Sequence, residues 1–207
     1  MRLYIARHGE TDWNKLKKIQ GRVDKEMNEN GVRQVREVAN GLAGVDFDAV
    51  YSSPLNRAIE TARIVGRNDS IIIDEKLYEI SFGDLEGADY KNVREWDVEN
   101  LTEIQNRVRA FFGMPHKYEP LGDGESYDSL LDRADKFLRE IVEKHERDRN
   151  ILVVTHSTFI HALISIIQKV PISKIWEIHI PNCSVSILEC LNNECKVVEL
   201  GKIFYEK

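Results

Sequence analysis

Apolar and polar positions alternate in blocks along the chain, and the blocks have two lengths. Four short blocks are apolar or rich in β-branched residues, which is typical of strands covered on both faces of a sheet. They span residues 3–6, 49–51, 71–73 and 151–155. Residues 184–190 and 196–200 flank the polar stretch 191–194, which indicates an antiparallel hairpin at one sheet edge.

The longer blocks carry apolar residues at helical spacing. They span residues 31–42, 55–65, 128–145 and 157–169. Asn28 precedes the first as an N-cap, Pro54 suits the first turn of the second, and the last ends before Pro171. Strands and helices therefore alternate, which predicts an α/β fold: a three-layer α/β/α sandwich around a mostly parallel central sheet, with an antiparallel edge hairpin.

Residues 88–124 interrupt this alternation. The segment holds scattered charges, an irregular Gly113-Met114-Pro115 sequence and several aromatic side chains. The aromatic residues are Tyr90, Trp96, Phe111, Phe112 and Tyr118. We interpret the segment as a small inserted lid within a single domain that covers residues 1–207, because such insertions often shape a substrate pocket. The alternative is a packing excursion with no role in binding.

Composition narrows the class of protein. Hydrophobic residues make up 42% and charged residues 31%, and no apolar run approaches the ~20 residues that span a membrane. The net charge of −6, without a long basic run, argues against nucleic-acid binding. Because Arg7 and His8 cut the N-terminal apolar stretch short, it does not have the form of a signal peptide, and we expect a cytoplasmic protein.

The cysteines give no sign of a cross-linked or metal-bound fold. Cys183, Cys190 and Cys195 are odd in number and include no C-x-x-C pair. We therefore expect buried or edge-strand thiols rather than a disulfide framework or a zinc site.

Two predicted strands end in histidine. Arg7, His8 and Gly9 follow the first strand, and His156 and Ser157 follow the strand at 151–155. A single histidine in such a place is more often structural, but ligands of parallel sheets bind outside the carboxyl ends of the strands. Together these groups predict a site for a dianion, with glycine where the backbone approaches the ligand.

A third strand end and a following loop add a cation and a carboxylate. Arg57 falls in the first turn of a helix, where backbone amides and a guanidinium attract anions. An imidazole such as that of His8 is nucleophilic near neutral pH and can accept a phosphoryl group. Glu79 would have a raised pKa beside bound phosphate, and could protonate the leaving group and then activate water. Taken singly, Arg57 and Glu79 would be ordinary surface charges.

Six segments of the chain, in order, resemble the histidine phosphatase superfamily, the phosphoglycerate-mutase-like group. They are ARHGETDWN, SSPLNRAIETA, LYEISFGDLEG, GES, VVTHSTFIHAL and NCSVSILE, and they extend over nearly the whole chain. The resemblance implies that His8 is the phosphate-accepting nucleophile and Glu79 the acid and base. It also implies a set of phosphoryl-binding residues, Arg7, Asn14, Arg57 and His156. The family works without metal, and we expect no cofactor.

The chain departs from the family pattern at several positions. Ser157 stands where glycine is frequent, and His161 where arginine is frequent. Gln20 and Gly21, on the loop after the proposed nucleophile, are candidate substrate contacts, although a solvated loop is equally compatible with their position. We include Ser157 with them as a candidate contact.

The resemblance implies a metal-independent phosphomonoesterase that acts on a small phosphorylated metabolite through a phosphohistidine. Broad specificity, α-ribazole phosphate and phosphoserine are the options for its substrate. The alternative enzyme is a cofactor-dependent phosphoglycerate mutase, in which arginine and tyrosine commonly follow the glutamate; here Ile80-Ser81-Phe82 follows it. A non-catalytic phospho-ligand binder would lack the nucleophile or the acid. A homodimer formed through the C-terminal hairpin is a further expectation.

Overall fold

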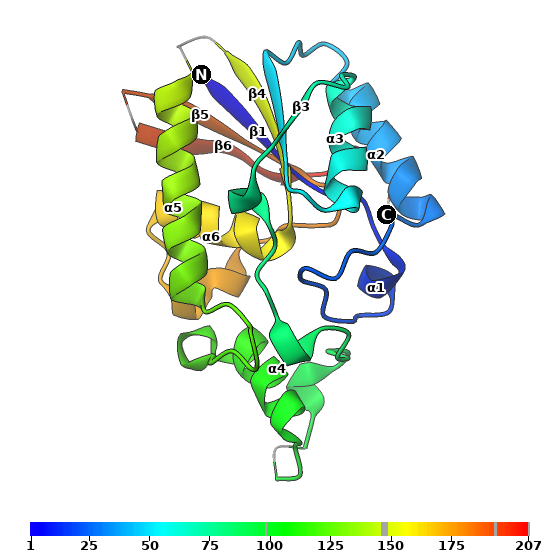
Figure 1. Ribbon diagram of the computed structural model, residues 1–207, viewed down its shortest axis with the longest axis vertical. Helices are drawn as coiled ribbons and strands as arrows, with labels where there is room; N and C mark the ends of the chain where they lie inside the picture. Colours follow the sequence, from blue (N-terminus) through cyan, green and yellow to red (C-terminus); the bar gives the residue numbers. More distant parts are fainter. Residues whose placement is uncertain (98, 146–148, 193, 207) are drawn as a thin grey trace.

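The computed structural model describes residues 1–97, 99–145, 149–192 and 194–206, which form a six-stranded sheet with helices on both faces (Figure 1). The strands are β1 (Arg2–Arg7), β2 (Ala49–Ser52), β3 (Ile71–Ile73), β4 (Asn150–Thr155), β5 (Val185–Leu191) and β6 (Glu194–Lys202). Their spatial order is β3-β2-β4-β1-β5-β6. Strands β1 to β4 are parallel, whereas β5 is antiparallel to both of its neighbours. The predicted α/β sandwich with a mostly parallel sheet is confirmed.

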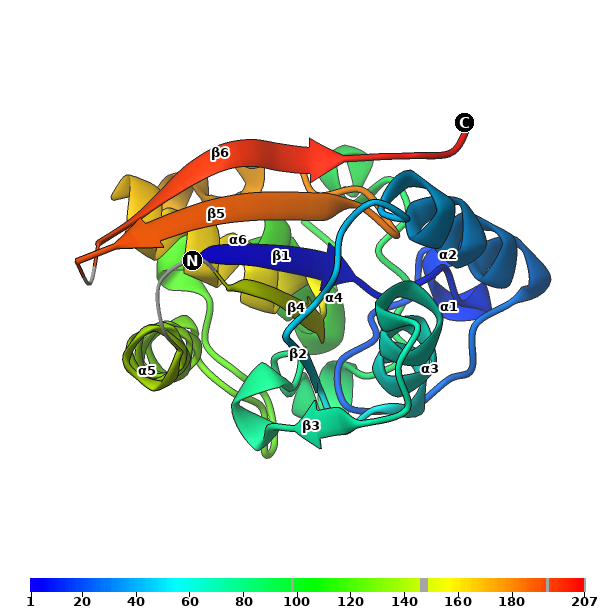
Figure 2. The same cartoon turned by 90° about the horizontal axis from the view of Figure 1, so that it is seen from above.

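Four of the helices form two pairs that cover opposite faces of the sheet. The helices are α1 (Asp12–Lys15), α2 (Glu29–Gly41), α3 (Asn56–Gly66), α4 (Glu103–Gly113), α5 (Tyr127–Lys144) and α6 (Ser157–Gln168). Seen from above, α2 and α3 lie together at one side of the strands, and α5 and α6 lie at the other (Figure 2). No helix in the described ranges is long and apolar enough to cross a membrane.

The alternation of side chains along the central strands explains the two layers. In β1, Leu3 and Ile5 belong to the core cluster of α5 and α6, whereas Tyr4 and Ala6 belong to the cluster of α2 and α3. Successive residues of a strand point to opposite faces. An apolar run without polar interruptions is therefore what a strand with helices on both sides requires.

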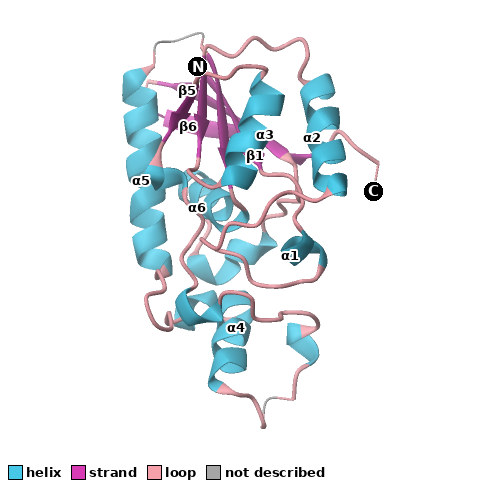
Figure 3. Cartoon of the chain, turned by 45° about the vertical axis from the view of Figure 1, so that its right-hand side comes forward, coloured by secondary structure: helices cyan, strands magenta, loops and turns pink. Residues whose placement is uncertain are grey.

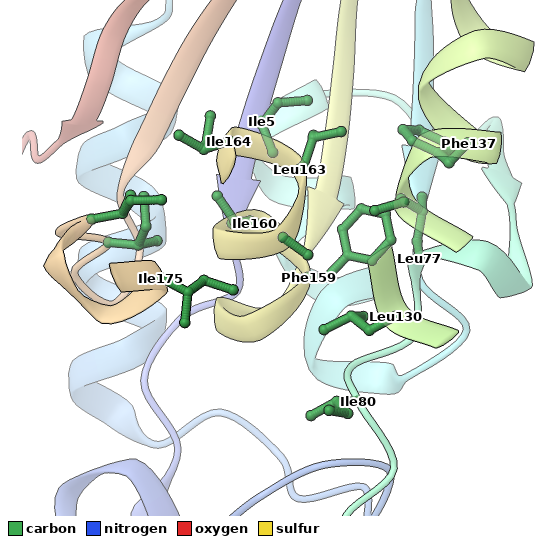
Figure 4. Packing of buried hydrophobic residues seen from close by; sticks show 14 of the residues in the cluster. Ile5, Leu77, Ile80, Leu130, Phe137, Phe159, Ile160, Leu163, Ile164 and Ile175 are labelled. Carbon is green, nitrogen blue, oxygen red and sulfur yellow. The ribbon is translucent and has the colours of Figure 1, made fainter. Parts of the chain in front are cut away.

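Buried residues cover most of the circumference of helix α6. Phe159, Ile160 and Leu163 are fully buried, and Phe159 lies near Phe137 of α5 in Figure 4. Burial of each such side chain stabilises the fold by about 1.5–3 kcal/mol. The end of β4 and the start of α6, which meet at His156, are therefore held in place by the core.

Polar side chains stabilise the starts of the two helices on one face of the sheet, α2 and α3. Asn28 Oδ1 accepts a hydrogen bond from Gly31 N at 2.8 Å, so the predicted N-cap of α2 is confirmed. Helix α3 lacks a side-chain cap of its own, but Asn56 N donates to Asp24 Oδ2 at 2.8 Å. This contact docks the loop around residue 24 onto the start of α3.

The segment 88–124 lies beyond the sheet, at the end of the molecule to which the carboxyl ends of β1 and β4 point (Figures 1 and 3). It contains α4, and Phe111 of that helix fastens it to the body. The Phe111 ring lies 4.8 Å from the Phe82 ring, 5.1 Å from Tyr127 and 5.2 Å from Trp176, centroid to centroid. Val98, which belongs to the predicted lid, falls outside the described residues.

The cysteines require a correction. Strand pairing places Cys190 of β5 opposite Cys195 of β6 with their Cα atoms 4.1 Å apart, and a disulfide joins them. The expectation of free thiols is wrong for this pair and right for Cys183, which is buried and free. An odd count of cysteines carries no information on the register of a hairpin, and the register decides which residues face each other. Dimerisation through this hairpin stays a prediction.

Candidate active site

His8 lies at the carboxyl end of β1 and is almost fully buried. Its backbone N–H donates to Thr155 O at 3.1 Å, and its Nδ1 lies 2.7 Å from Gly9 O. Because a carbonyl oxygen can only accept, Nδ1 carries the proton and Nε2 keeps its lone pair. Burial, followed by the charges of Arg57 and Arg7, lowers the pKa of His8 well below the ordinary histidine value. The imidazole is therefore neutral at neutral pH.

His156 lies beside His8 because β1 and β4 are neighbours in the sheet and pair up to Arg7 and Thr155. The two imidazole centroids are 5.0 Å apart. His156 Nε2 lies 2.8 Å from Ser53 Oγ, and its buried Nδ1 has no partner among the described residues. Burial lowers the pKa of His156 well below its ordinary value as well.

Two arginines supply the positive charge. Arg57 is fully buried; its Nη2 donates to Gly21 O at 2.6 Å and its Nη1 to Val23 O at 3.0 Å. Burial lowers its pKa to about 10, so the guanidinium keeps its charge at neutral pH. Arg7 Nη1 donates to Ile180 O at 3.0 Å. In both arginines Nε is buried and lacks a partner within the described part of the chain, so each retains a donor that fits an anion.

Glu79 is 4% exposed and lies against the start of α6. Its carboxylate accepts N–H groups from Ile80 at 3.0 Å, Thr158 at 3.0 Å and Phe159 at 3.2 Å. Burial raises the pKa of the Glu79 carboxyl, while the N–H groups of Thr158 and Ile80 and the charge of Arg57 oppose the rise. The sequence-based expectation attributed a raised pKa to bound phosphate, but burial is sufficient to give that direction.

Asn14 and Gln20 are oriented by one threonine. Asn14 Oδ1 accepts the N–H of Thr11 at 3.1 Å in a capping box at α1, and Thr11 Oγ1 donates to Gln20 Oε1 at 2.6 Å. The Nε2 group of Gln20 is buried without a partner in the described ranges. Both residues, with Ser157, line a cavity of about 150 Å³ that also contains Arg7, His8 and Glu79. Arg57 and His156 are fully buried and do not belong to this lining.

Gly9 and Gly21 do not belong to the cavity lining. Gly9 allows close packing of α2, and Gly21 accepts a hydrogen bond from Arg57. A Cβ atom on Gly9 would lie 2.8 Å from Val35 Cγ2 and 2.9 Å from Gly31 O, so the space is taken by α2. The structure thus gives close helix packing, not approach of a ligand, as the reason for glycine at position 9. Gly21 contributes the carbonyl that holds Arg57.

Several cavity residues have no signal in the sequence that singles them out. Phe82, Thr158, Trp176 and Lys18 line the cavity together with the segment aromatics Tyr90, Phe111 and Phe112. Trp176 lies in the short 3-10 helix η5 (Ile172–Glu177), and its Nε1 donates to Phe111 O at 2.8 Å. The Trp176 ring also lies 4.7 Å from the imidazole of His161, whose Nδ1 lies 2.7 Å from Ser157 O and whose Nε2 lies 2.9 Å from Ile178 O. The contacts of Trp176 join residues far apart in the sequence, so periodicity could not reveal them.

Among the described residues, no group of three His, Cys, Asp or Glu side chains could hold a metal ion, and the positive charge comes from arginines. Two neutral imidazoles, two guanidinium groups and a buried carboxyl at the carboxyl ends of parallel strands define an α/β enzyme with a site for a phosphoryl group.

Comparisons with known proteins agree with that class. The family model described as "Histidine phosphatase superfamily (branch 1)" matches residues 3–203, and the chain belongs to this family. Phosphoserine phosphatase 1 of Hydrogenobacter thermophilus is 30% identical over 203 residues, which is 97% of this chain and 92% of that protein. The family membership and such relatives make this chain a phosphatase.

Two solved structures extend the similarity to the fold. Bacillus stearothermophilus YhfR superposes with a TM-score of 0.85 at 31% identity and covers 98% of this chain and 97% of its own. Phosphoserine phosphatase from Entamoeba histolytica in complex with 3-phosphoglyceric acid superposes with a TM-score of 0.82 at 26% identity, covering 97% of this chain and 96% of its own. Structural neighbours of this chain thus bind small phosphorylated compounds.

Proposed function

We propose that this phosphatase is a metal-independent phosphomonoesterase that hydrolyses small-molecule phosphate esters through a phosphohistidine at His8. The observation that carries the proposal is the contact of His8 Nδ1 with Gly9 O, because it leaves Nε2 unprotonated in a site lined with positive charge. A nucleophile that needs no separate base can attack phosphorus as soon as the ester is held in line.

In the first step, His8 Nε2 bonds to phosphorus, and the bond between phosphorus and the ester oxygen breaks. The proton on Glu79 passes to the leaving alkoxide. In the second step, the Glu79 carboxylate takes a proton from water, whose oxygen attacks phosphorus and releases His8 with inorganic phosphate. Arg7 and Arg57, with His156, stabilise the charge on the equatorial phosphoryl oxygens.

Hydrolysis is favoured over the mutase reaction by the cavity. A mutase holds the carboxylate of a glycerate while the phosphoryl group is on histidine, which requires cations beyond those on the phosphoryl group. Beyond Arg7, the described lining offers one further cation, Lys18, among aromatic side chains. Such a wall accommodates varied organic leaving groups, which supports broad specificity, with α-ribazole phosphate and phosphoserine as the named candidates.

His8→Ala tests the proposal. The variant should lose turnover of 4-nitrophenyl phosphate, whereas His116→Ala, a matched change at an exposed histidine, should not. Rapid acid-free quenching of the wild type with radiolabelled substrate should trap an acid-labile phosphohistidine on the peptide that contains residue 8. Unchanged turnover by His8→Ala would refute the mechanism. A panel of esters with 3-phosphoglycerate and bisphosphoglycerate completes the test, because isomerisation faster than phosphate release would favour the mutase.

A further inference from the structure

A second cavity adjoins the candidate active site and has no part in the steps above. Its volume is about 400 Å³, and it lies between the end of α4 and η5. Phe112 and Trp176 line both cavities, and their rings are 5.2 Å apart, centroid to centroid. The two cavities are thus separated by a shared aromatic wall.

The first cavity is too small to enclose most organic phosphate esters. Its volume of about 150 Å³ is below the roughly 300–1,000 Å³ of typical small-molecule sites. Once the phosphoryl group lies at His8, little of that space remains for the alcohol. A leaving group of more than a few atoms has to extend beyond this lining. One way leads past Phe112 and Trp176 to the larger cavity on the other side of these rings. Another leads past Arg7, Asn14 and Tyr90 to a polar cavity of about 580 Å³ that lacks the aromatic pair.

The second cavity also has its own charge. Arg109 of α4 and Lys174 of η5 line it together with one carboxylate, Glu177. Within the described residues, neither cation forms an ion pair. Arg109 is half-buried, which strengthens its interaction with an anion relative to open solvent. A guanidinium from α4 and an ammonium group from η5 in one cavity fit a carboxylate or a second phosphate.

We propose that this cavity is a distal subsite for the leaving group, given the proposed function at His8. The substrates it fits are phosphate monoesters whose alcohol carries a planar or aromatic part against Phe112 and Trp176 and ends in an anionic group between Arg109 and Lys174. Phosphoserine and 3-phosphoglycerate carry their carboxylates only a few bonds from the phosphoryl group, so they remain in the first cavity. The subsite therefore selects longer esters than these.

A ladder of 4-(ω-carboxyalkyl)phenyl phosphates, each paired with its methyl ester, tests the subsite. In the wild type, kcat/KM should favour the acid over the ester at one chain length by about fivefold, as expected for partly exposed ion pairs. The double variant Arg109→Gln/Lys174→Gln should bring that ratio to about one, and its turnover of phenyl phosphate should equal that of the wild type. The matched control Arg36→Gln/Lys136→Gln removes the same charges from exposed positions on α2 and α5, and should leave the ratio unchanged.

Three results would overturn the subsite. One is an acid-to-ester ratio at or below one at every chain length. The second is an acid-to-ester ratio that the double variant does not lower. The third is a loss of phenyl phosphate turnover in the double variant that equals its loss with the carboxylate substrates. Failure of the proposed function has a different signature, since His8→Ala would then still hydrolyse phenyl phosphate.

Discussion

Arg133 of α5 connects the helix to the chain just before Glu79. Its Nε and Nη2 donate to the two oxygens of Glu125 at 3.0 and 2.7 Å, and its Nη1 donates to Lys76 O at 2.6 Å and Tyr78 O at 2.7 Å. The side chains of Arg133 and Glu125 are only 15% and 9% exposed. Arg133→Met keeps the aliphatic stem but leaves two carbonyls without these donors, at about 1 kcal/mol each. It also leaves the nearly buried Glu125 carboxylate with only its more distant cation, Arg22, whose Nη2 lies 3.5 Å from Oε2. We expect a loss of about 3 kcal/mol in the free energy of unfolding, the low end for a buried pair because both groups retain some solvent.

Urea unfolding of the wild type, Arg133→Met, Glu125→Gln and the double variant measures this loss and the coupling between the two residues. The coupling should be about 1–2 kcal/mol. Arg139→Met is the matched control, because Arg139 makes an exposed pair with Asp135 on the same helix and should cost at most about 0.5 kcal/mol. A loss below about 1 kcal/mol for Arg133→Met, or a coupling near zero, would refute the reasoning. The contacts of Arg133 also hold the chain next to Glu79. In Arg133→Met, turnover of phenyl phosphate should therefore fall more than turnover of 4-nitrophenyl phosphate.

Two further predictions concern a glycine and a carboxyl. A Cβ atom on Gly31 would lie 2.7 Å from Glu10 N, so Gly31→Ala should destabilise the fold by about 1–3 kcal/mol in urea unfolding, whereas Gly44→Ala, with no atom within 4 Å, should not. Equal stability of the two variants would contradict the packing explanation. Burial raises the pKa of the Glu79 carboxyl, so the acid form persists to higher pH, and kcat/KM for phenyl phosphate should fall as pH rises through that pKa. Glu79→Gln should remove this alkaline decline and slow phenyl phosphate by about 10²-fold; a decline that persists in the variant would assign it to another group.

The layered fold could be predicted from the sequence because its main signals are local. The apolar run around Leu3 needs two covered faces, and Asn28 caps a helix through an atom three residues away. The hairpin at the sheet edge was also predicted, but the pairing of Cys190 with Cys195 was not. That pairing depends on strand register, and neither the number nor the spacing of the cysteines determines register.

In the candidate site too, residues with local sequence signals could be predicted, and residues placed by long-range contacts could not. His8 and His156 could be brought together from the sequence because each follows a strand and parallel strands share one carboxyl edge. Trp176 and Lys18 could not be found in this way. Trp176 of η5 is held at the cavity by its hydrogen bond to Phe111 O of α4, a contact between residues 65 positions apart in the sequence. Tertiary packing alone decides which side chains form that wall.

Arg7 and Arg57 affect the pKa values of both His8, the proposed nucleophile, and Glu79, the proposed acid. In the free protein, Arg57 and Arg7 contribute to lowering the pKa of His8, and the same two guanidinium groups oppose the rise in the pKa of Glu79. A bound phosphate dianion offsets their charge. Both pKa values then rise, so the imidazole becomes a more basic nucleophile while the carboxyl holds its proton more firmly. In the proposed mechanism, therefore, substrate binding itself prepares the two groups, because the arginines that hold the phosphoryl group are also the charges that set their protonation.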